Sequence, residues 1–494
     1  MEFLSALSSD GLTVSLCFGV VCLLIYLSFL HNRVNIPGPF AIPVFGNIFQ
    51  ILFYGRCYRY EKLHKLYGNV SRLYLGRRLF VMICGKDLIY DAFVRQADSF
   101  SDRPDGMTEI LDQKKEHGII WSNGETWKVL RRFTLQSMRD FGLGKECLED
   151  RILEECNVVL GEMSRTDSKL FRIVNLYKDA VSNITHTIIF GKRCDYQDSA
   201  FREVIYNIDM FFSLSLGGIS PTTIWPFLKL FLKSDLATRT TCLKNISRYI
   251  KAQVEEHKSS FDAAHIRDFV DLYLQAEKNG QSADIITHGQ MFRVILNLFG
   301  AGTDTTATSL NWAALYMISF PEVQTRCQRD IDKVVGQGRQ MRLSDKPDLP
   351  YVEATLLEVQ RLANVAIASL PHVASRDAVV GGFRIPKGAI VMAGLQATHE
   401  DQNCWNDPLV FRPDRFIGSD GKIKKLEGFM PFSVGPRACL GDSLAKKVMF
   451  LIFCNTLQSF NLRKKDEGDI LSLEGELGIT RMPKPYELRA IPRK

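Results

Sequence analysis

Apolar and polar residues recur with a helical period over most of the chain. The clearest helical runs are LNLFGAGTDTTATSLNWAALYMISF at residues 296–320 and SLAKKVMFLIFCNTLQSF at residues 443–460. Period-two alternation is confined to short segments. VSRLYLGRRLFVMIC predicts two strands joined near Gly76, and LGITRMPKPYELRAIPRK predicts a C-terminal hairpin with its turn at residues 478–480. We therefore expect a mainly α fold with a minor β region.

The N-terminal segment carries an uncharged apolar run at residues 11–30, long enough to cross a bilayer as a helix of about 20 residues. A removed signal peptide is the alternative, but its apolar core is usually shorter. Basic Arg33 follows the run, so the positive-inside rule keeps the remaining chain in the cytosol. We expect a transmembrane anchor over residues 1–33, a proline-rich hinge or simple linker over 34–48, and one catalytic domain over 49–494.

Composition fits one large enzyme domain. The chain has 494 residues, of which 46% are hydrophobic, and no repeat divides it into small modules. Its 12 cysteines are scattered without a C-x-x-C pair, which is typical of free thiols in a reducing compartment. The net charge of +7 is not gathered in one block, so we expect no nucleic-acid partner, and an acidic protein partner fits better.

One stretch, FSVGPRACLG at residues 432–441, places Cys439 just before a predicted helix. The unpaired N–H groups of a helix start favour a thiolate, the form that binds metal. Gly435 and Gly441 would let the backbone pass close to a flat ligand, and Arg437 could meet a carboxylate. The alternative is an inert cysteine in the core.

A second stretch holds Gly300 and Gly302 inside a predicted helix, where each glycine costs about 1 kcal/mol against alanine. A local opening of the helical hydrogen-bond ladder beside a ligand would explain them. The alternative is an ordinary buried helix rich in serine and threonine. Elsewhere, Glu358 and Arg361 share a helix face, and Arg415 could close a charge network with them.

These stretches, in this order, resemble the cytochrome P-450 superfamily of haem-thiolate monooxygenases. NGETWKVLRRF, RDFGLGK, FGAGTDTT and PFSVGPRACLGDSLA are most similar to the animal microsomal family-two type. The resemblance implies the P-450 fold and haem b with Cys439 as the iron ligand. It implies further cofactor contacts from Arg103, Trp127, Arg131, Ala301, His372, Phe432, Gly435, Arg437 and Gly441.

The resemblance also implies roles outside the haem contacts. Thr305 and Asp304 would relay protons to dioxygen, and Glu358, Arg361 and Arg415 would hold the haem-binding core together. The predicted substrate contacts are apolar, namely Ile119, Ile120, Phe299, Val365, Ala366 and Ile479, together with Ala301 and Thr305. An apolar lining indicates a small apolar substrate.

The implied activity is insertion of one oxygen atom from O2 into a fatty acid, a steroid or sterol, or a xenobiotic, by hydroxylation or epoxidation. NADPH electrons would come from NADPH–cytochrome P-450 reductase, with cytochrome b5 as a second candidate donor. Residues 209–233 would be either core or a membrane-dipping lid. The basic residues Lys128, Arg132, Lys446 and Lys447 would form a docking face or a solvated surface.

The implied location is the endoplasmic reticulum membrane, with the catalytic domain facing the cytosol. Two other functions would keep Cys439. One is a haem-thiolate isomerase or dehydratase acting on lipid peroxides, which would need neither the proton relay nor a reductase. The other is a non-catalytic haem-binding sensor.

Overall fold

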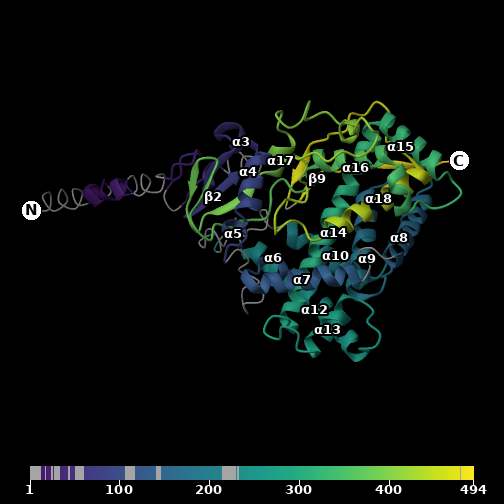
Figure 1. The fold of residues 1–494 in the computed structure, drawn as a ribbon, viewed down its shortest axis with the longest axis horizontal. Coiled ribbons are helices and arrows are strands. Elements are labelled where there is room, and N and C mark those ends of the chain that lie inside the picture. The colour runs from purple at the N-terminus through teal and green to yellow at the C-terminus, as the bar shows by residue number, and fades with distance from the viewer. Residues whose placement is uncertain are drawn as a thin grey trace, which may run out of the picture.

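The structure of the chain is a computed structural model that describes residues 13–16, 18–23, 26, 34–42, 45–50, 61–105, 117–140, 146–213, 228, 230, 233–478 and 480–493. Most of this part of the chain is helical, and the strands form small sheets (Figure 1). The predicted mainly α fold with a minor β region is therefore confirmed.

The predicted anchor lies mostly outside the described residues. Its described positions, 13–16, 18–23 and 26, are helical and exposed. Among the residues that the structure describes, no helix is both long and apolar enough to cross a membrane.

The helices are short near the N-terminus and long in the centre. In chain order they are α3 (Glu61–Tyr67), α4 (Lys86–Tyr90), the π-helix η2 (Asp91–Arg95), α5 (Ala97–Phe100), α6 (Gly118–Trp121), α7 (Gly124–Asp140), α8 (Glu146–Arg165), α9 (Ile173–Phe190), α10 (Ser199–Ser213), α12 (Lys233–Ser259), α13 (Phe269–Lys278), α14 (His288–Ser319), α15 (Pro321–Val334), the 3-10 helix η5 (Leu343–Asp348), α16 (Pro350–Ala363), α17 (Leu395–His399), the 3-10 helix η6 (Pro413–Phe416) and α18 (Asp442–Ser459).

Within the described residues, the strands pair in four small sheets. The largest has the order β1-β2-β6-β3, built from β1 (Val70–Leu75), β2 (Arg78–Ile83), β6 (Ile390–Ala393) and β3 (His372–Val373). The others are two-stranded and pair β7 (Phe460–Lys464) with β10 (Leu488–Pro492), β4 (Ala378–Val380) with β5 (Phe383–Ile385), and β8 (Gly475–Leu477) with β9 (Arg481–Pro483). In Figure 1 β2 lies on the side of the N-terminal segment, and α15 and α18 lie toward the opposite side.

Two strand predictions can be compared with these sheets. β1 and β2 pair in antiparallel fashion, Leu75 opposite Arg78, so the two strands joined near Gly76 are confirmed. The C-terminal segment agrees only in part with the predicted hairpin. β8 and β9 flank the predicted turn at residues 478–480, but the last strand, β10, pairs with β7.

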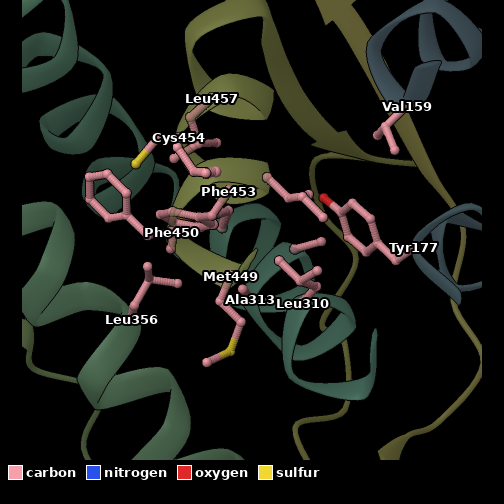
Figure 2. Packing of buried hydrophobic residues seen from close by; sticks show 14 of the residues in the cluster. Val159, Tyr177, Leu310, Ala313, Leu356, Met449, Phe450, Phe453, Cys454 and Leu457 are labelled. Atoms are coloured by element: carbon pink, nitrogen blue, oxygen red, sulfur yellow. The ribbon is translucent and has the colours of Figure 1, made fainter. Parts of the chain in front are cut away.

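The main hydrophobic core lies where α18 packs on α14 and α16 (Figure 2). Phe450, Phe453 and Leu457 of α18 are buried with Leu310 of α14 and Leu356 of α16. Complete burial of one such side chain stabilises the fold by about 1.5–3 kcal/mol. Because α18 begins directly after the loop that carries the predicted ligand cysteine, this packing also fixes the loop.

The central helix is α14, which contacts α6, α9, α12, α16 and α18. It begins where the Thr287 side chain accepts a hydrogen bond from the Gln290 N–H (3.2 Å), and it continues without interruption to Ser319. The helix therefore has no break at Gly300 or Gly302, where the sequence predicted a local opening of the hydrogen-bond ladder beside a ligand. Gly302 serves packing instead, because a Cβ there would press against the side chain of Thr185 on α9 at 3.2–3.3 Å.

The described part of the predicted hinge, residues 34–42 and 45–48, lies along β1. The Arg72 N–H donates to the Pro37 carbonyl (2.7 Å), and the Arg72 guanidinium donates to the Ile36 carbonyl (2.8 Å). Further along, the buried Asn47 side chain accepts from the Tyr74 N–H (2.8 Å). These bonds attach the segment to the sheet.

The junction of α12 and α13 contains a buried ion pair. His257 Nε2 lies 2.8 Å from an Asp268 oxygen, and Nδ1 lies 2.7 Å from the Gln253 carbonyl oxygen. Both ring nitrogens therefore face acceptors, which fits a protonated ring. Burial lowers the pKa of His257, but the Asp268 carboxylate outweighs this effect, so the pKa is raised overall.

This ion pair predicts pH-dependent stability. A group whose pKa is raised by folding contributes its full stabilisation at pH values below its pKa in the unfolded state. That contribution is lost as the pH rises through its pKa in the folded state. We expect the Tm to fall as the pH rises above the ordinary histidine pKa of about 6.5, and His257→Gln to remove that component. Thermal unfolding followed by circular dichroism measures it, with the exposed His265→Gln as control. Equal slopes in wild type and His257→Gln would contradict the assignment.

Candidate functional site

The cysteine loop, residues 432–441, leads into α18. The Cys439 N–H donates to the Phe432 carbonyl (2.9 Å), which closes the loop. Burial raises the pKa of the Cys439 thiol, while the N–H groups of Gly441 and Asp442 at the start of α18 act in the opposite direction. The helix start thus favours the thiolate against desolvation.

The Cys439 side chain is accessible to solvent in this chain although loss of hydration dominates its pKa. Solvent access and loss of hydration are compatible for a sulfur that lines an interior binding surface, because protein atoms surround such a sulfur on most sides. An inert core cysteine such as Cys454 is buried instead. The environment of Cys439 is that of a ligand-facing thiol.

Gly435 brings the loop against the π-helix η2. Its φ is +81°, a conformation that favours glycine, and a Cβ there would collide with the carbonyl oxygen of Phe93. The Ala438 N–H donates to the Gly435 carbonyl (3.0 Å) and holds this turn. The positive φ and the close approach to Phe93 therefore both require glycine at position 435.

Two arginines beside the loop are held by main-chain carbonyls. Arg103 donates to the Pro371 carbonyl (2.7 Å), and Arg437 donates to the Ser101 carbonyl (2.8 Å). Asn123 joins them, because its side-chain oxygen accepts from the Arg103 N–H (2.7 Å) and from Arg437 Nη2 (3.2 Å). The loop of residues 101–105 and the cysteine loop are fastened together here.

Trp127 and Arg131 of α7 complete this group. Arg131 donates to the Ala438 carbonyl in the cysteine loop (2.8 Å). The guanidinium carbon of Arg437 lies 3.9 Å from the centre of the Trp127 ring, and that of Arg131 lies 6.0 Å from it. The Trp127 ring therefore has two guanidinium groups near it, a cation–π arrangement.

This group carries positive charge that the protein only partly compensates. Burial and the neighbouring guanidinium groups lower the pKa of Arg103 and of Arg437 to about 9, and Asp102 partly offsets this effect at Arg437. Burial also lowers the pKa of Arg131. One nitrogen of Arg437, Nη1, is buried without a hydrogen-bond partner. Buried cations with an unsatisfied donor are suited to an anionic ligand, and the two propionates of haem b fit them.

His372 on β3 lies at the edge of the same group. Its Nδ1 is 2.6 Å from the Phe100 carbonyl oxygen, so Nδ1 carries the proton. Burial, followed by the charge of Arg103, holds the pKa of His372 well below its usual value. The ring is neutral in this chain, and the nitrogen that could face a ligand, Nε2, has its lone pair there.

The α14 helix presents a small accessible face within an otherwise buried segment. Ala301 and Thr305 are accessible, whereas Phe299, Thr303 and Thr306 are buried. The Thr305 hydroxyl donates to the Ala301 carbonyl (2.8 Å), so both residues belong to the same turn. A ligand that lies against α14 would contact this face.

Asp304 points away from that face. One carboxylate oxygen accepts from the Thr480 hydroxyl (2.7 Å), and the other lies 4.0 Å from Lys178 Nζ. Asp304 and Thr305 are adjacent in sequence, but their side chains have different hydrogen-bond partners. The acid and the alcohol therefore occupy different surroundings.

The predicted substrate residues on α6 are attached to α14. The Gly118 N–H donates to the Gln290 side chain (3.0 Å), and the Ile120 N–H donates to the Asn297 side chain (3.2 Å). Ile119 is buried in the same hydrophobic cluster as Phe299, and Ile120 packs against that cluster. The structure thus brings α6 and α14 together.

The other predicted substrate residues are less uniform. Phe299 is fully buried, its ring centre 6.1 Å from that of His186 on α9, so it lies in the helical core. Val365 is partly buried and Ala366 is exposed, just after α16. Ile479 lies outside the described residues. The structure does not place Phe299 on the accessible face of α14.

Glu358, Arg361 and Arg415 form a closed, buried network. Glu358 lies 2.7 Å from Arg361 Nε and 2.8 Å from Arg415 Nε, and Glu358 and Arg361 have no exposed surface. Arg361 also donates to the carbonyls of His399 and Pro408, both at 2.7 Å. The network holds α16, α17 and the segment before η6 together.

Three residues of the site were not predicted from the sequence. Asn123 bridges two arginines, Thr480 binds Asp304, and His399 Nε2 accepts from the Met430 N–H (3.0 Å), just before the cysteine loop. Asn123 precedes a glycine, which signals only a turn. The partners of all three are distant in sequence, so no local pattern could identify them.

A cavity of about 610 Å³, lined mainly by charged and polar residues, lies elsewhere, between the C-terminal ends of α7, α9 and α12 and the start of α13. Its lining includes none of the predicted site residues. Two of its carboxylates are already paired, Glu256 with Lys192 (2.7 Å) and Asp268 with His257 (2.8 Å). This cavity is separate from the cysteine loop.

The mainly helical fold, the glycine-shaped cysteine loop before a core helix and the neighbouring arginines fit a haem-thiolate protein. Comparison with known proteins agrees. The sequence profile "Cytochrome P450" matches residues 36–490. The chain is 36% identical over 472 residues to cytochrome P450 2B4 of Oryctolagus cuniculus, covering 94% of this chain and 95% of that protein.

Two further relatives are similar over nearly their whole lengths. Cytochrome P450 2J2 of Homo sapiens is 35% identical over 486 residues, 97% of this chain and 96% of that protein. Cytochrome P450 2H1 of Gallus gallus is 33% identical over 488 residues, 97% of this chain and 99% of that protein. The chain belongs to the cytochrome P450 family and is a monooxygenase of its family-two type, with haem iron as cofactor and O2 as oxidant.

The cysteine loop predicts a position-specific effect of adding one methyl group. Gly435→Ala should reduce haem content and Tm because the Cβ would force the loop away from Phe93. Gly421→Ala is the matched control, since its φ is +76° with no atom within 4 Å of the added Cβ. The control should lose only the strain of its backbone conformation, about 1–3 kcal/mol. Haem absorbance per protein and thermal unfolding measure both, and equal losses would contradict the close approach.

Proposed function

We propose that this chain hydroxylates or epoxidises a small apolar molecule, such as a fatty acid, a steroid or sterol, or a xenobiotic, with NADPH electrons supplied by NADPH–cytochrome P-450 reductase. The observation that carries this proposal is the accessible Cys439 thiol at the start of α18, beside a group of partly uncompensated arginines. A thiol and buried cations together match the iron and the two propionates of haem b.

In this proposal Cys439 is the iron ligand. Phe432, Gly435 and Gly441 shape the loop around it, and Ala301 lies on the facing surface of α14. Arg103, Arg131 and Arg437, with Trp127, hold the propionates. When bound, thiolate-ligated haem supplies the activation of dioxygen. The chain's own residues hold the cofactor and exclude water.

His372 is the remaining proposed propionate contact. Because Nδ1 already donates to Phe100, the ring needs a second proton at Nε2 before it can donate to a propionate. A propionate nearby would favour that protonated form, opposing the effect of burial and of Arg103. His372 would then bind the cofactor as a cation.

Thr305 and Asp304 are the proposed proton donors. The Thr305 hydroxyl lies on the accessible face of α14, where it can hydrogen-bond to a ligand after leaving the Ala301 carbonyl. Asp304 is turned toward Thr480 and must rotate to pass a proton to that face. Asp304, the proposed source of the proton, therefore lies apart from the residues that are proposed to contact the substrate.

The proposed substrate contacts are Ile119, Ile120, Phe299, Val365, Ala366 and Ile479. The attachment of α6 to α14 supports the first two, whose apolar side chains favour an apolar substrate. Phe299 would contribute only by supporting this wall from behind. Glu358, Arg361 and Arg415 would keep the haem-binding core folded, because their charges are buried and mutually paired.

The proposed partners follow from the electron supply. Lys128 and Arg132 are exposed on α7, and Lys446 and Lys447 are partly buried on α18, so these basic residues could meet an acidic reductase or cytochrome b5. We place the chain at the endoplasmic reticulum membrane with the catalytic domain facing the cytosol. The proposed division is an anchor over residues 1–33, a hinge over 34–48 and the catalytic domain over 49–494.

Reconstitution tests this proposal directly. The full chain with haem, a flavoprotein reductase and NADPH should convert a member of a panel of fatty acids, sterols and drug-like compounds into a product heavier by one oxygen atom. The reduced protein with carbon monoxide should show the absorption band of thiolate ligation, and Cys439→Ser should abolish both. Mass spectrometry and difference spectroscopy provide the readouts.

Two outcomes would overturn this function. Turnover of lipid peroxides without NADPH would favour an isomerase or dehydratase. A bound haem that never oxidises NADPH in the presence of the reductase would favour a sensor. An unchanged carbon monoxide band in Cys439→Ser would reject that ligand.

The α14 face predicts the effect of removing one hydroxyl. Thr305→Ala should increase the share of NADPH electrons released as hydrogen peroxide, because proton delivery from this face would slow. General acid catalysis contributes a factor of about 10²–10⁴ in rate. Ser309→Ala is the matched control, since the Ser309 hydroxyl also donates to the carbonyl four residues earlier (2.9 Å). Peroxide per NADPH consumed is the measurement. Tightly coupled product formation in Thr305→Ala would contradict the role of Thr305.

A further inference from the structure

The helix α12 carries a cation on its apolar face. Its buried positions follow a helical spacing, and hydrophobic side chains fill four of them, namely Leu243, Ile246, Ile250 and Val254. Arg239, one turn before Leu243, lies on the same face and is only 8% exposed. Helical periodicity by itself would place an apolar residue at this position.

The surroundings of Arg239 are apolar. Its guanidinium carbon lies 5.3 Å from the centre of the Phe211 ring on α10, a cation–π contact. Phe211 packs against the hydrophobic cluster that contains Ile208 of α10 and Leu243 of α12. Burial lowers the pKa of Arg239, and no carboxylate of the described residues raises it. One guanidinium nitrogen, Nε, is buried without a hydrogen-bond partner.

The other buried arginines have partners within the protein. Arg72 and Arg103 donate to main-chain carbonyls at 2.8 Å and 2.7 Å, and Arg361 lies 2.7 Å from the Glu358 carboxylate. In the part of the chain that the structure describes, Arg239 has neither a carbonyl nor a carboxylate partner. Burying an unpartnered cation costs free energy, so a ligand that supplies the missing anion would offset this cost.

The pairing of α10 with α12 places Arg239 at one end of their contact. Phe211 faces Arg239, whereas the Asn245 side chain donates to the Asn207 side-chain oxygen (3.2 Å), so the two helices run antiparallel. Arg239 belongs to the second turn of α12, and Phe211 to the last turn of α10. The guanidinium group therefore lies at the edge of the cluster, where a polar head group can reach it without crossing the core.

The same cluster forms the apolar wall of the candidate site. Ile119 of α6 and Phe299 of α14 belong to it together with Ile208 and Leu243. In addition, α12 contacts α14 directly. A ligand with an anionic head group at Arg239 could therefore lay its apolar part along this cluster and present a carbon of that part to the accessible face of α14.

We propose that Arg239 binds the carboxylate of the substrate, so that the enzyme selects amphiphilic acids, such as fatty acids, over neutral molecules of the same length. A planar guanidinium group suits this role because two of its N–H groups can meet both oxygens of a carboxylate. The inference rests on the proposed function and deepens it, because it names the substrate class by its head group.

Ligand binding to the haem-loaded full chain tests the role of Arg239. Dodecanoate and dodecanol have the same chain length, so the ratio of their Kd values isolates the head group. Arg239→Met should shift this ratio against dodecanoate about tenfold or more, because hydrogen bonds to charged groups are lost. Arg239→Lys should retain part of the preference, since it keeps the charge and loses the planar fork. The change in haem absorbance on titration gives each Kd.

Arg248→Met is the matched control, because it removes one positive charge from an exposed position of the same helix. Its Kd ratio should stay within about twofold of the wild-type ratio, since an exposed charge contributes little. An unchanged ratio in Arg239→Met would overturn the proposal. A shift of equal size in Arg248→Met would also overturn it, because the preference would then reflect overall charge.

Thermal unfolding distinguishes ligand binding from a structural role. Without ligand, Arg239→Met should raise the Tm, because an apolar side chain replaces an unpartnered buried cation. Dodecanoate should raise the Tm of the wild type more than that of Arg239→Met. A lower Tm of Arg239→Met without ligand would reject the proposal and indicate that Arg239 supports the fold. Neither titration nor unfolding requires NADPH or reductase, so failure of this inference is separate from failure of the proposed monooxygenase function.

Discussion

The packing of α18 against α14 is the contact on which the rest of the site depends. α18 carries the cysteine loop at its start, and α14 carries Ala301 and Thr305 on its accessible face. Their buried side chains, Phe450 and Leu310 among them, share one close-packed cluster. Because a close-packed interior resists small displacements, the thiol and the α14 face keep a fixed relation. The Glu358 network supports the same frame from the opposite side of α16.

The second constraint is the free-energy cost of burying charge. The Glu358 network and the arginines beside the cysteine loop meet this cost in different ways. Glu358 has its carboxylate bonded to two guanidinium groups, so the protein satisfies that cluster internally. Arg103 and Arg437 have mainly carbonyl partners, and besides burial the charge of Arg131 lowers the pKa of Arg103 and that of Arg103 lowers the pKa of Arg437. Burying such cations costs several kcal/mol each unless an anion compensates them. Cofactor binding should therefore stabilise the fold as well as permit chemistry.

Features with a local signal could be predicted from the sequence. Helical periodicity identified α14 and α18, alternation identified β1 and β2, and glycines with a cysteine identified the loop. The prediction that both Phe299 and Ala301 contact the ligand did not take helix geometry into account. At about 100° per residue, positions 299 and 301 lie on nearly opposite sides of α14, so both could not face one ligand. The close approach of Gly302 to Thr185 could not be predicted, because Thr185 lies in another helix.

The partners of Asp304 could not be predicted, because they come from α9 and from the turn after β8. The same 100° step explains why this arrangement is useful. It turns Asp304 toward Lys178 and Thr480 while Thr305, the next residue, stays on the accessible face. A carboxylate on that face would be desolvated beside an apolar substrate, at a high cost in free energy. Placing the charge one position earlier keeps it solvated by polar groups, and the proposed proton transfer to the hydroxyl would then require rotation of the Asp304 side chain.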